Sequence, residues 1–186
     1  MHNAMRRRAV AALRTALRRR HGQATWFGVS ASLVAAVGAT IVQPPSPRLL
    51  WNASASAPLG LWHVAPDAPL RRGDMVAARL AAPWRALAAR RHYLPANVPL
   101  LKRIAALAGD QICADGGRII VNGAIVAMPR STDAADRPMP RWQGCTVLGD
   151  DALLLLMDDP ASFDGRYFGP TARGDIIGKA TPLWLR

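Results

Sequence analysis

Two serines and one lysine have the residue types that nucleophilic catalysis requires. Ser54 and Ser56 belong to the run Asn-Ala-Ser-Ala-Ser-Ala-Pro-Leu-Gly-Leu-Trp over residues 52–62. Alanine neighbours leave room for another chain beside the hydroxyls, the proline stiffens the backbone and the glycine permits a bend. Lys102 belongs to the apolar run Leu-Leu-Lys-Arg-Ile. A serine in this setting becomes a nucleophile if a nearby base removes its proton.

Lys102 is the candidate base, because a strand would carry it into the core while Arg103 faces the opposite side. At an ordinary pKa of about 10.4, only about one lysine in two thousand is neutral at pH 7. Burial lowers a lysine pKa by as much as 3–5 units, roughly. The alternative is a structural lysine whose ammonium reaches solvent.

Histidine and metal chemistry have less support. The four histidines, at positions 2, 21, 63 and 92, show no spacing typical of metal ligands, and neither His63 nor His92 has an evident acid partner. The two cysteines, Cys113 and Cys145, form no C-x-x-C motif. We expect no metal and no cofactor. In an oxidising compartment the cysteines would form a disulfide, and two buried thiols are the alternative.

The net charge of +12 is concentrated at the N-terminus. More than half of it comes from the arginines at positions 6, 7, 8, 14, 18, 19 and 20. Residues 24–42 then carry no charge, which is about the length of a membrane-spanning helix. We expect a basic cytoplasmic arm over 1–23, a transmembrane helix over 24–42, and an exported domain over 43–186. A cleaved signal peptide is the alternative, and no nucleic-acid partner is expected.

The exported part has the pattern of a mainly β, antiparallel domain. Short apolar runs read as strands over 61–64, 74–79, 100–107, 145–148, 152–157 and 175–185. Asn122-Gly123, between two β-rich runs over 118–126, predicts a hairpin with a type I′ turn. Residues 84–93 have helical composition, and 158–170 read as a turn-rich loop.

Three ordered motifs give this sequence a family resemblance. They are Ser-x-Pro-x-Gly-Leu-aromatic at Ser56, Leu-Leu-Lys-Arg-Ile at Lys102, and Ser-Phe-Asp-Gly-Arg-Tyr-Phe-Gly-Pro over 162–170. Together they resemble the Ser–Lys signal peptidases, and in particular the TraF-type conjugative-transfer branch. The motifs cover most of the domain after residue 52.

The resemblance implies a role for each matching residue. Ser56 would be the nucleophile and Lys102 the general base, while the Ser54 hydroxyl would help the Ser56 N–H form the oxyanion hole. Ser162, Asp164 and Arg166 would hold the lysine or brace the site, although a purely structural Asp164–Arg166 pair is equally consistent with the residues.

Three departures from the family pattern stand out. The serine lies two residues before the proline, where leader peptidases place it three before. Ala108 stands where the family commonly has proline, and Trp62 stands where it usually has tyrosine.

The implied function is that of an inner-membrane, single-pass serine endopeptidase with a periplasmic catalytic domain. Its substrate would be a membrane-tethered, pilin-like precursor, and its other partner the lipid bilayer. The acyl-enzyme could be opened by water or by a new amine, so hydrolysis and cyclisation are both consistent with the residues. The alternatives are a general leader peptidase, a self-cleaving repressor, and a non-catalytic membrane-anchored β scaffold of a conjugation apparatus.

Overall fold

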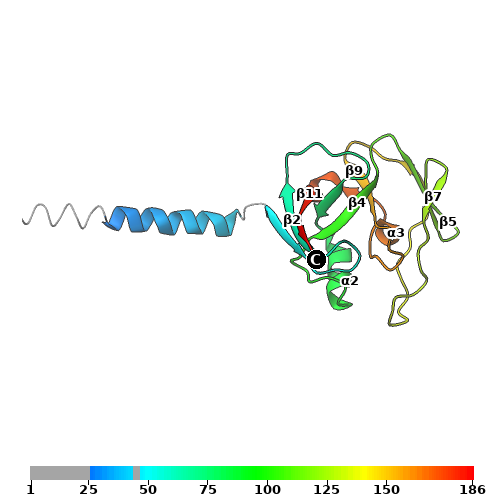
Figure 1. The fold of residues 1–186 in the computed structure, drawn as a ribbon, viewed down its shortest axis with the longest axis horizontal. Coiled ribbons are helices and arrows are strands. Elements are labelled where there is room, and N and C mark those ends of the chain that lie inside the picture. Colours follow the sequence, from blue (N-terminus) through cyan, green and yellow to red (C-terminus); the bar gives the residue numbers. More distant parts are fainter. Residues whose placement is uncertain (1–25, 44–46) are drawn as a thin grey trace, which may run out of the picture. The chain divides into compact units, whose positions relative to one another are not determined.

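The computed structural model describes residues 26–43 and 47–186, which divide into two compact units, Met1–Pro45 and Ser46–Arg186. In the first unit, residues 26–42 form a helix (Figure 1). No helix in the described ranges has both the length and the hydropathy needed to cross a membrane. The predicted basic arm, and residues 24 and 25 of the predicted span, lie outside the described residues.

The second unit is built on an antiparallel seven-stranded sheet (Figure 1). Its order is β1 (Leu49–Asn52), β2 (Gly60–Ala65), β11 (Ile176–Leu185), β3 (Met75–Ala78), β4 (Leu100–Ala106), β9 (Ala152–Leu156) and β10 (Thr171–Ala172). All neighbouring strands in this sheet are antiparallel. The sheet therefore positions both the candidate nucleophiles and the candidate base: the serine run connects β1 to β2, and Lys102 lies on β4.

A second antiparallel sheet has the order β7 (Ala124–Ala127), β6 (Arg118–Val121), β5 (Gln111–Asp115) and β8 (Gly144–Val147). Figure 1 shows β5 and β7 together at one end of the domain, apart from β2 and β11. Asn122 and Gly123, between β6 and β7, have φ angles of 50° and 83°. A type I′ turn needs two positive φ angles, so the predicted hairpin is confirmed.

Apolar side chains from both sheets and from two helices form the core. Ile112 and Ile119 of the smaller sheet pack with Leu154 and Leu156 of β9. The helix α2 (Ala82–Arg90) overlaps the predicted helical stretch over 84–93 but begins two residues earlier, and its Ala88 packs with the same cluster as Tyr167 on α3 (Gly165–Phe168). This cluster connects the surface helix to the segment that carries the third motif.

The mainly antiparallel β prediction is confirmed, with differences in detail. Five elements in the described chain had not been predicted from sequence: β1, β5, β10, α3 and the short 3-10 helix η1 (Arg173–Asp175). Thr171 and Ala172 of β10 pair with Leu153 and Ala152. The turn-rich interpretation of residues 158–170 was wrong where α3 forms, because Asp164 caps this helix by accepting a hydrogen bond from the Arg166 N–H.

Candidate active site

Lys102 is buried within β4, with only 3% of its surface exposed. Its Nζ atom lies 2.8 Å from Ser56 Oγ and 2.9 Å from Ser162 Oγ. Arg103, the next residue, faces the other side of the strand and pairs with Asp158 on the surface. The alternation predicted from the sequence is present, and it brings the lysine into contact with serines 46 and 60 residues away along the chain.

Burial lowers the pKa of Lys102 from 10.5 to about 8. The cause is desolvation, because the charged form loses water that the protein does not fully replace. The negative charges of Asp164 and Asp159 act in the opposite direction, while Arg166 lowers the pKa further. At pH 7 a group with this pKa is neutral in about a tenth of molecules, roughly 300 times more often than an ordinary lysine.

The serine run forms the connection between β1 and β2, whose last and first residues, Asn52 and Gly60, are paired. Ser54 Oγ and Ser56 Oγ lie 3.0 Å apart, and either can be the donor. Among the described residues, the Ser56 N–H donates no hydrogen bond. This N–H is therefore free to bind an oxygen brought to the Ser56 hydroxyl.

Gly60 is required here by close packing. Its φ angle is 141°, and a Cβ atom at this position would lie 2.1 Å from the Trp184 carbonyl oxygen of β11. Only glycine avoids both the unusual backbone angle and the collision. The glycine expected from sequence to permit a bend therefore also lets the end of β11 approach the serine loop.

Asp164 and Arg166 form a fully buried ion pair beside the lysine. Arg166 Nε donates to Asp164 Oδ1 at 2.8 Å and Arg166 Nη2 donates to Oδ2 at 3.1 Å. Asp164 Oδ2 accepts a hydrogen bond from the N–H of Met157, at the end of β9, and Arg166 Nη2 donates one to the Met157 C=O group. The pair thus joins α3 to β9 around the loop that carries Ser162.

A groove of about 610 Å³ runs past the hydroxyl groups. Residues from β1 and the serine loop, from β4 and from three other connecting segments line it, and these include Ser54, Ser56, Lys102 and Ser162. Asp164 and Arg166 do not line it. The first four residues can touch a bound chain, whereas the ion pair acts from behind the groove wall.

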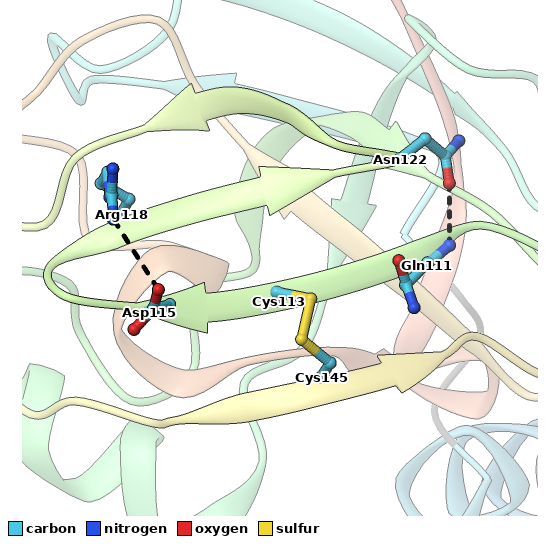
Figure 2. The surroundings of a disulfide bond; sticks show 6 residues. All are labelled: Gln111, Cys113, Asp115, Arg118, Asn122 and Cys145. Atoms are coloured by element: carbon cyan, nitrogen blue, oxygen red, sulfur yellow. Dashed lines mark hydrogen bonds and ion pairs between the residues drawn. A yellow bond between two sulfur atoms is a disulfide. The ribbon is translucent and has the colours of Figure 1, made fainter.

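Cys113 and Cys145 form a disulfide between directly paired positions of β5 and β8 (Figure 2). Their Cα atoms are 4.1 Å apart. Neither cysteine lines the groove. The bridge fastens β8, whose side chains are exposed, to the middle of the smaller sheet.

Asn52 belongs to the site but was not recognised from the sequence. It is buried, and its side chain forms four hydrogen bonds with the serine loop. The available signal was its type and place, because an asparagine before a run of small residues commonly accepts a hydrogen bond from the N–H two residues later. Ser54 N donates that bond at 3.1 Å.

The site shows no arrangement for a metal ion. No cluster of three or more His, Cys, Asp or Glu residues in the described part of the chain could hold one. His63 and His92 do not line the groove. The side-chain groups that contact Ser56 Oγ are the Ser54 hydroxyl and the buried Lys102 amine, while Arg130, Asp133 and Asp159 lie elsewhere in the groove lining.

This fold and this site define an antiparallel β domain in which a groove serine contacts a buried lysine. The chain belongs to the signal peptidase, peptidase S26, family, whose pattern matches residues 22–185. Within that family it is of the TraF type.

Three individual proteins illustrate the similarity. The chain is 34% identical over 178 residues to a probable conjugal transfer protein TraF of Sinorhizobium fredii, covering 88% of this chain and 90% of that protein. A plasmid transfer protein TraF of Escherichia coli is 38% identical over 90 residues, which are 45% of this chain and 50% of that protein. This match therefore spans only half of the Escherichia coli relative. A signal peptidase I crystal structure from Enterococcus faecalis aligns at 18% identity with a TM-score of 0.37, covering 61% of this chain and 98% of that one.

Proposed function

We propose that this protein is a serine endopeptidase in which Ser56 is the nucleophile and Lys102 the general base. The observation that carries the proposal is the 2.8 Å contact between Ser56 Oγ and a buried lysine amine with a lowered pKa, in a groove of about 610 Å³. A neutral amine has a lone pair that can accept the serine proton across this contact. Family membership supports the same chemistry.

Acylation would proceed in two steps. Lys102 Nζ takes the proton from Ser56 Oγ as this oxygen bonds to the scissile carbonyl carbon, and the carbonyl oxygen becomes an oxyanion. The Ser56 N–H and the Ser54 hydroxyl stabilise that negative charge. The C–N bond then breaks, the lysine gives its proton to the leaving amine, and the substrate's acyl group remains on Ser56.

Deacylation repeats these proton-transfer and bond-breaking steps with a second nucleophile. Lys102 takes a proton from a water molecule or from an amine, and the nucleophile displaces Ser56 Oγ. Water releases a free carboxylate, whereas an amine of the same substrate gives a cyclic product. Ser162 supports both steps by holding Nζ at 2.9 Å, beside Ser56.

The substrate in this proposal is a membrane-tethered, pilin-like precursor, cut next to its signal or propeptide segment. The names of the relatives place them in plasmid and conjugal transfer, which supports a substrate of that kind. The proposed location is the inner membrane, with the domain in the periplasm. The uncharged stretch 24–42 and the basic arm before it support this location.

Two exposed tryptophans, one on β1 and one on β11, also support a position near lipid. Trp51 is half exposed and lies 5.7 Å, between ring centroids, from the exposed Trp184 of β11. Tryptophan favours the membrane interface. Leu49 beside Trp51 on β1 is also exposed, whereas Leu50 between them is buried in the core.

Cleavage of a precursor peptide that spans a processing site tests the proposal. Mass spectrometry of the products identifies the cleaved bond. We expect Ser56→Ala and Lys102→Ala to abolish cleavage, because they remove the nucleophile and the base. Lys102→Arg should also abolish it, because arginine keeps its proton at any workable pH. Ser54→Ala should retain activity reduced about 10- to 100-fold, since one oxyanion donor is lost. A folded Lys102→Arg variant with near-normal turnover would contradict the general-base role, and intact activity in Ser56→Ala would favour the scaffold alternative.

A further inference from the structure

The loop that carries Ser56 is folded around the side-chain amide of one buried residue, Asn52. Asn52 Nδ2 lies 3.0 Å from each of three carbonyl oxygens, those of Ser54, Ala57 and Pro58. Asn52 Oδ1 accepts a hydrogen bond from Ser54 N at 3.1 Å. One side chain thereby holds backbone atoms on both sides of Ser56.

Few other contacts in the described structure hold this loop. Residues 53–59 contain one internal backbone hydrogen bond, from Ala57 N to Ser54 O, and it is long at 3.3 Å. From outside the loop, Arg186 N donates to the Leu59 carbonyl at 3.0 Å and Lys102 Nζ donates to Ser56 Oγ at 2.8 Å. The Trp62 indole N–H adds a bond to the Pro58 carbonyl at 3.2 Å. Without the Asn52 amide, several backbone groups would have to find water or rearrange. The amide thus takes the place of the ladder hydrogen bonds that a tighter hairpin would make.

The position of this amide bears directly on the chemistry. Ser54 and Ala57 are the anchored residues, and the Ser56 N–H between them has no acceptor among the described residues. Donors to an oxyanion accelerate a reaction only when they are held in place before the charge develops. A loop held at two points around Ser56 keeps its N–H and its hydroxyl in one orientation.

We propose that Asn52 is a positioning residue for the nucleophile, one that holds the Ser56 N–H and the Ser54 hydroxyl in place as oxyanion donors. This inference rests on the proposed function of Ser56. Asn52 makes no hydrogen bond to Lys102, whereas Ser162 contacts that lysine directly. Apart from the Ser56–Lys102 hydrogen bond itself, the serine loop and the lysine are held by separate sets of contacts, and an uncharged substitution of Asn52 slows acylation without moving the pKa of the base.

The experiment compares Asn52→Ser and Asn52→Asp with a matched control, Asn122→Asp. Asn122 Oδ1 also accepts a hydrogen bond from a backbone N–H, that of Gln111 in the smaller sheet (Figure 2). Its Nδ2 donates to Asp110, the residue before β5, and Asn122 lies outside the groove. The full chain reacts with an alanyl peptide p-nitrophenyl ester, and the nitrophenolate burst gives the maximal acylation rate and the half-saturating concentration. Thermal unfolding is measured in parallel.

We expect both Asn52 variants to acylate about 100-fold more slowly and within threefold of the wild-type half-saturating concentration. The pH inflection should be unchanged in Asn52→Ser, which adds no charge beside Lys102. Asn122→Asp should lose stability but keep its acylation rate within about twofold. Asn52→Ser buries no charge, so it supplies the answer if Asn52→Asp does not fold.

Two results would overturn the inference. One is an Asn52→Ser acylation rate within threefold of wild type. The other is a rate loss accompanied by a shifted pH inflection, which would mean that the change acts on Lys102. Failure of the proposed function gives a different result: wild-type protein and Ser56→Ala would then show the same absence of a burst.

Discussion

Lys102 is buried at a cost that its surroundings only partly offset. Its amine has hydroxyl partners at 2.8 and 2.9 Å, and the carboxylates of Asp164 and Asp159 favour its charged form, yet its pKa still falls to about 8. Desolvation therefore outweighs the favourable charges. A lysine kept near its ordinary pKa would be more stable as a cation and would be a worse base near neutral pH.

This cost predicts how stability depends on pH. The folded pKa of about 8 is below the ordinary 10.5, so between these values the unfolded chain binds more protons than the folded one. Stability contributed by this residue therefore rises with pH through that window and is lowest below pH 8.

Urea unfolding of wild type and Lys102→Met at pH 7, 8, 9 and 10 measures this effect. The unfolding free energy of wild type, relative to the variant, should rise with pH by an amount on the order of 3 kcal/mol in total. Other titrating groups cancel in the comparison. A difference that stays constant from pH 7 to pH 10 would show that Lys102 has an unshifted pKa.

At the scale of elements, α3 and the serine loop hold the reactive groups from two sides. α3 begins at Gly165, between Asp164 and Arg166, directly against β9. A Cβ atom at Gly165 would lie 2.8 Å from the Leu155 carbonyl oxygen and 2.9 Å from Leu154 Cδ1. The glycine in this motif therefore permits the close contact that fixes the position of the ion pair and of Ser162.

Gly165→Ala should accordingly lower both stability and acylation. We expect a loss of about 1–3 kcal/mol, as for overpacked sites, and at least a tenfold slower burst because Ser162 moves away from Lys102. Gly174→Ala is the control, since a Cβ there has no neighbour within 4 Å. Equal effects of the two substitutions, measured by urea unfolding and by the burst, would argue against the packing explanation.

The disulfide should stabilise the domain without taking part in the chemistry. It closes a loop of 32 residues, which is worth about 3–4 kcal/mol on a chain-entropy estimate. We expect no free thiol in denatured, unreduced protein from the exported side. The Cys113→Ser/Cys145→Ser variant should melt at lower temperature but acylate within about twofold of wild type. Two free thiols, or a burst lost in a folded variant, would contradict this account.

The elements that the sequence predicted well are those with a local cause. Asn122-Gly123 dictates its own turn, and the alternation around Lys102 follows from strand geometry. β5, which lies between β6 and β8, has a less distinctive pattern because its exposed ends are polar. α3 is too short for helical periodicity to be visible and depends on packing against β9.

In the candidate site, too, some residues could be predicted from the sequence and others could not. Ser56 and Lys102 are predictable from type and motif, but the bonds of Asn52 exist only after β1 and β2 pair and the loop closes. For Asp164 and Arg166 the residue types alone allow a pair, but only the folded chain shows that Asp164 caps α3 and pairs with Arg166 across the first turn of this helix.

In the proposed function, an N-terminal membrane anchor precedes a domain that carries out the acylation chemistry by itself. The anchor would concentrate the enzyme beside its tethered precursor, so its removal should affect encounter rather than chemistry. A shortened protein beginning at Gln43 should show the wild-type burst with a soluble ester but process a membrane-embedded precursor at least tenfold more slowly. Equal processing of the embedded precursor by both forms would exclude a role of the N-terminal segment in presenting substrate.

The central claim is that Lys102 activates Ser56, and the pH dependence of Ser56 acylation tests it most directly. The burst rate is measured from pH 5 to pH 10, with Ser56→Ala as the background for uncatalysed ester hydrolysis. The account predicts a rate that rises tenfold per pH unit and levels off near pH 8, where the buried amine becomes neutral. An inflection near pH 6.5, the ordinary range of histidine, or a burst that persists in Lys102→Met with the same pH profile would contradict it.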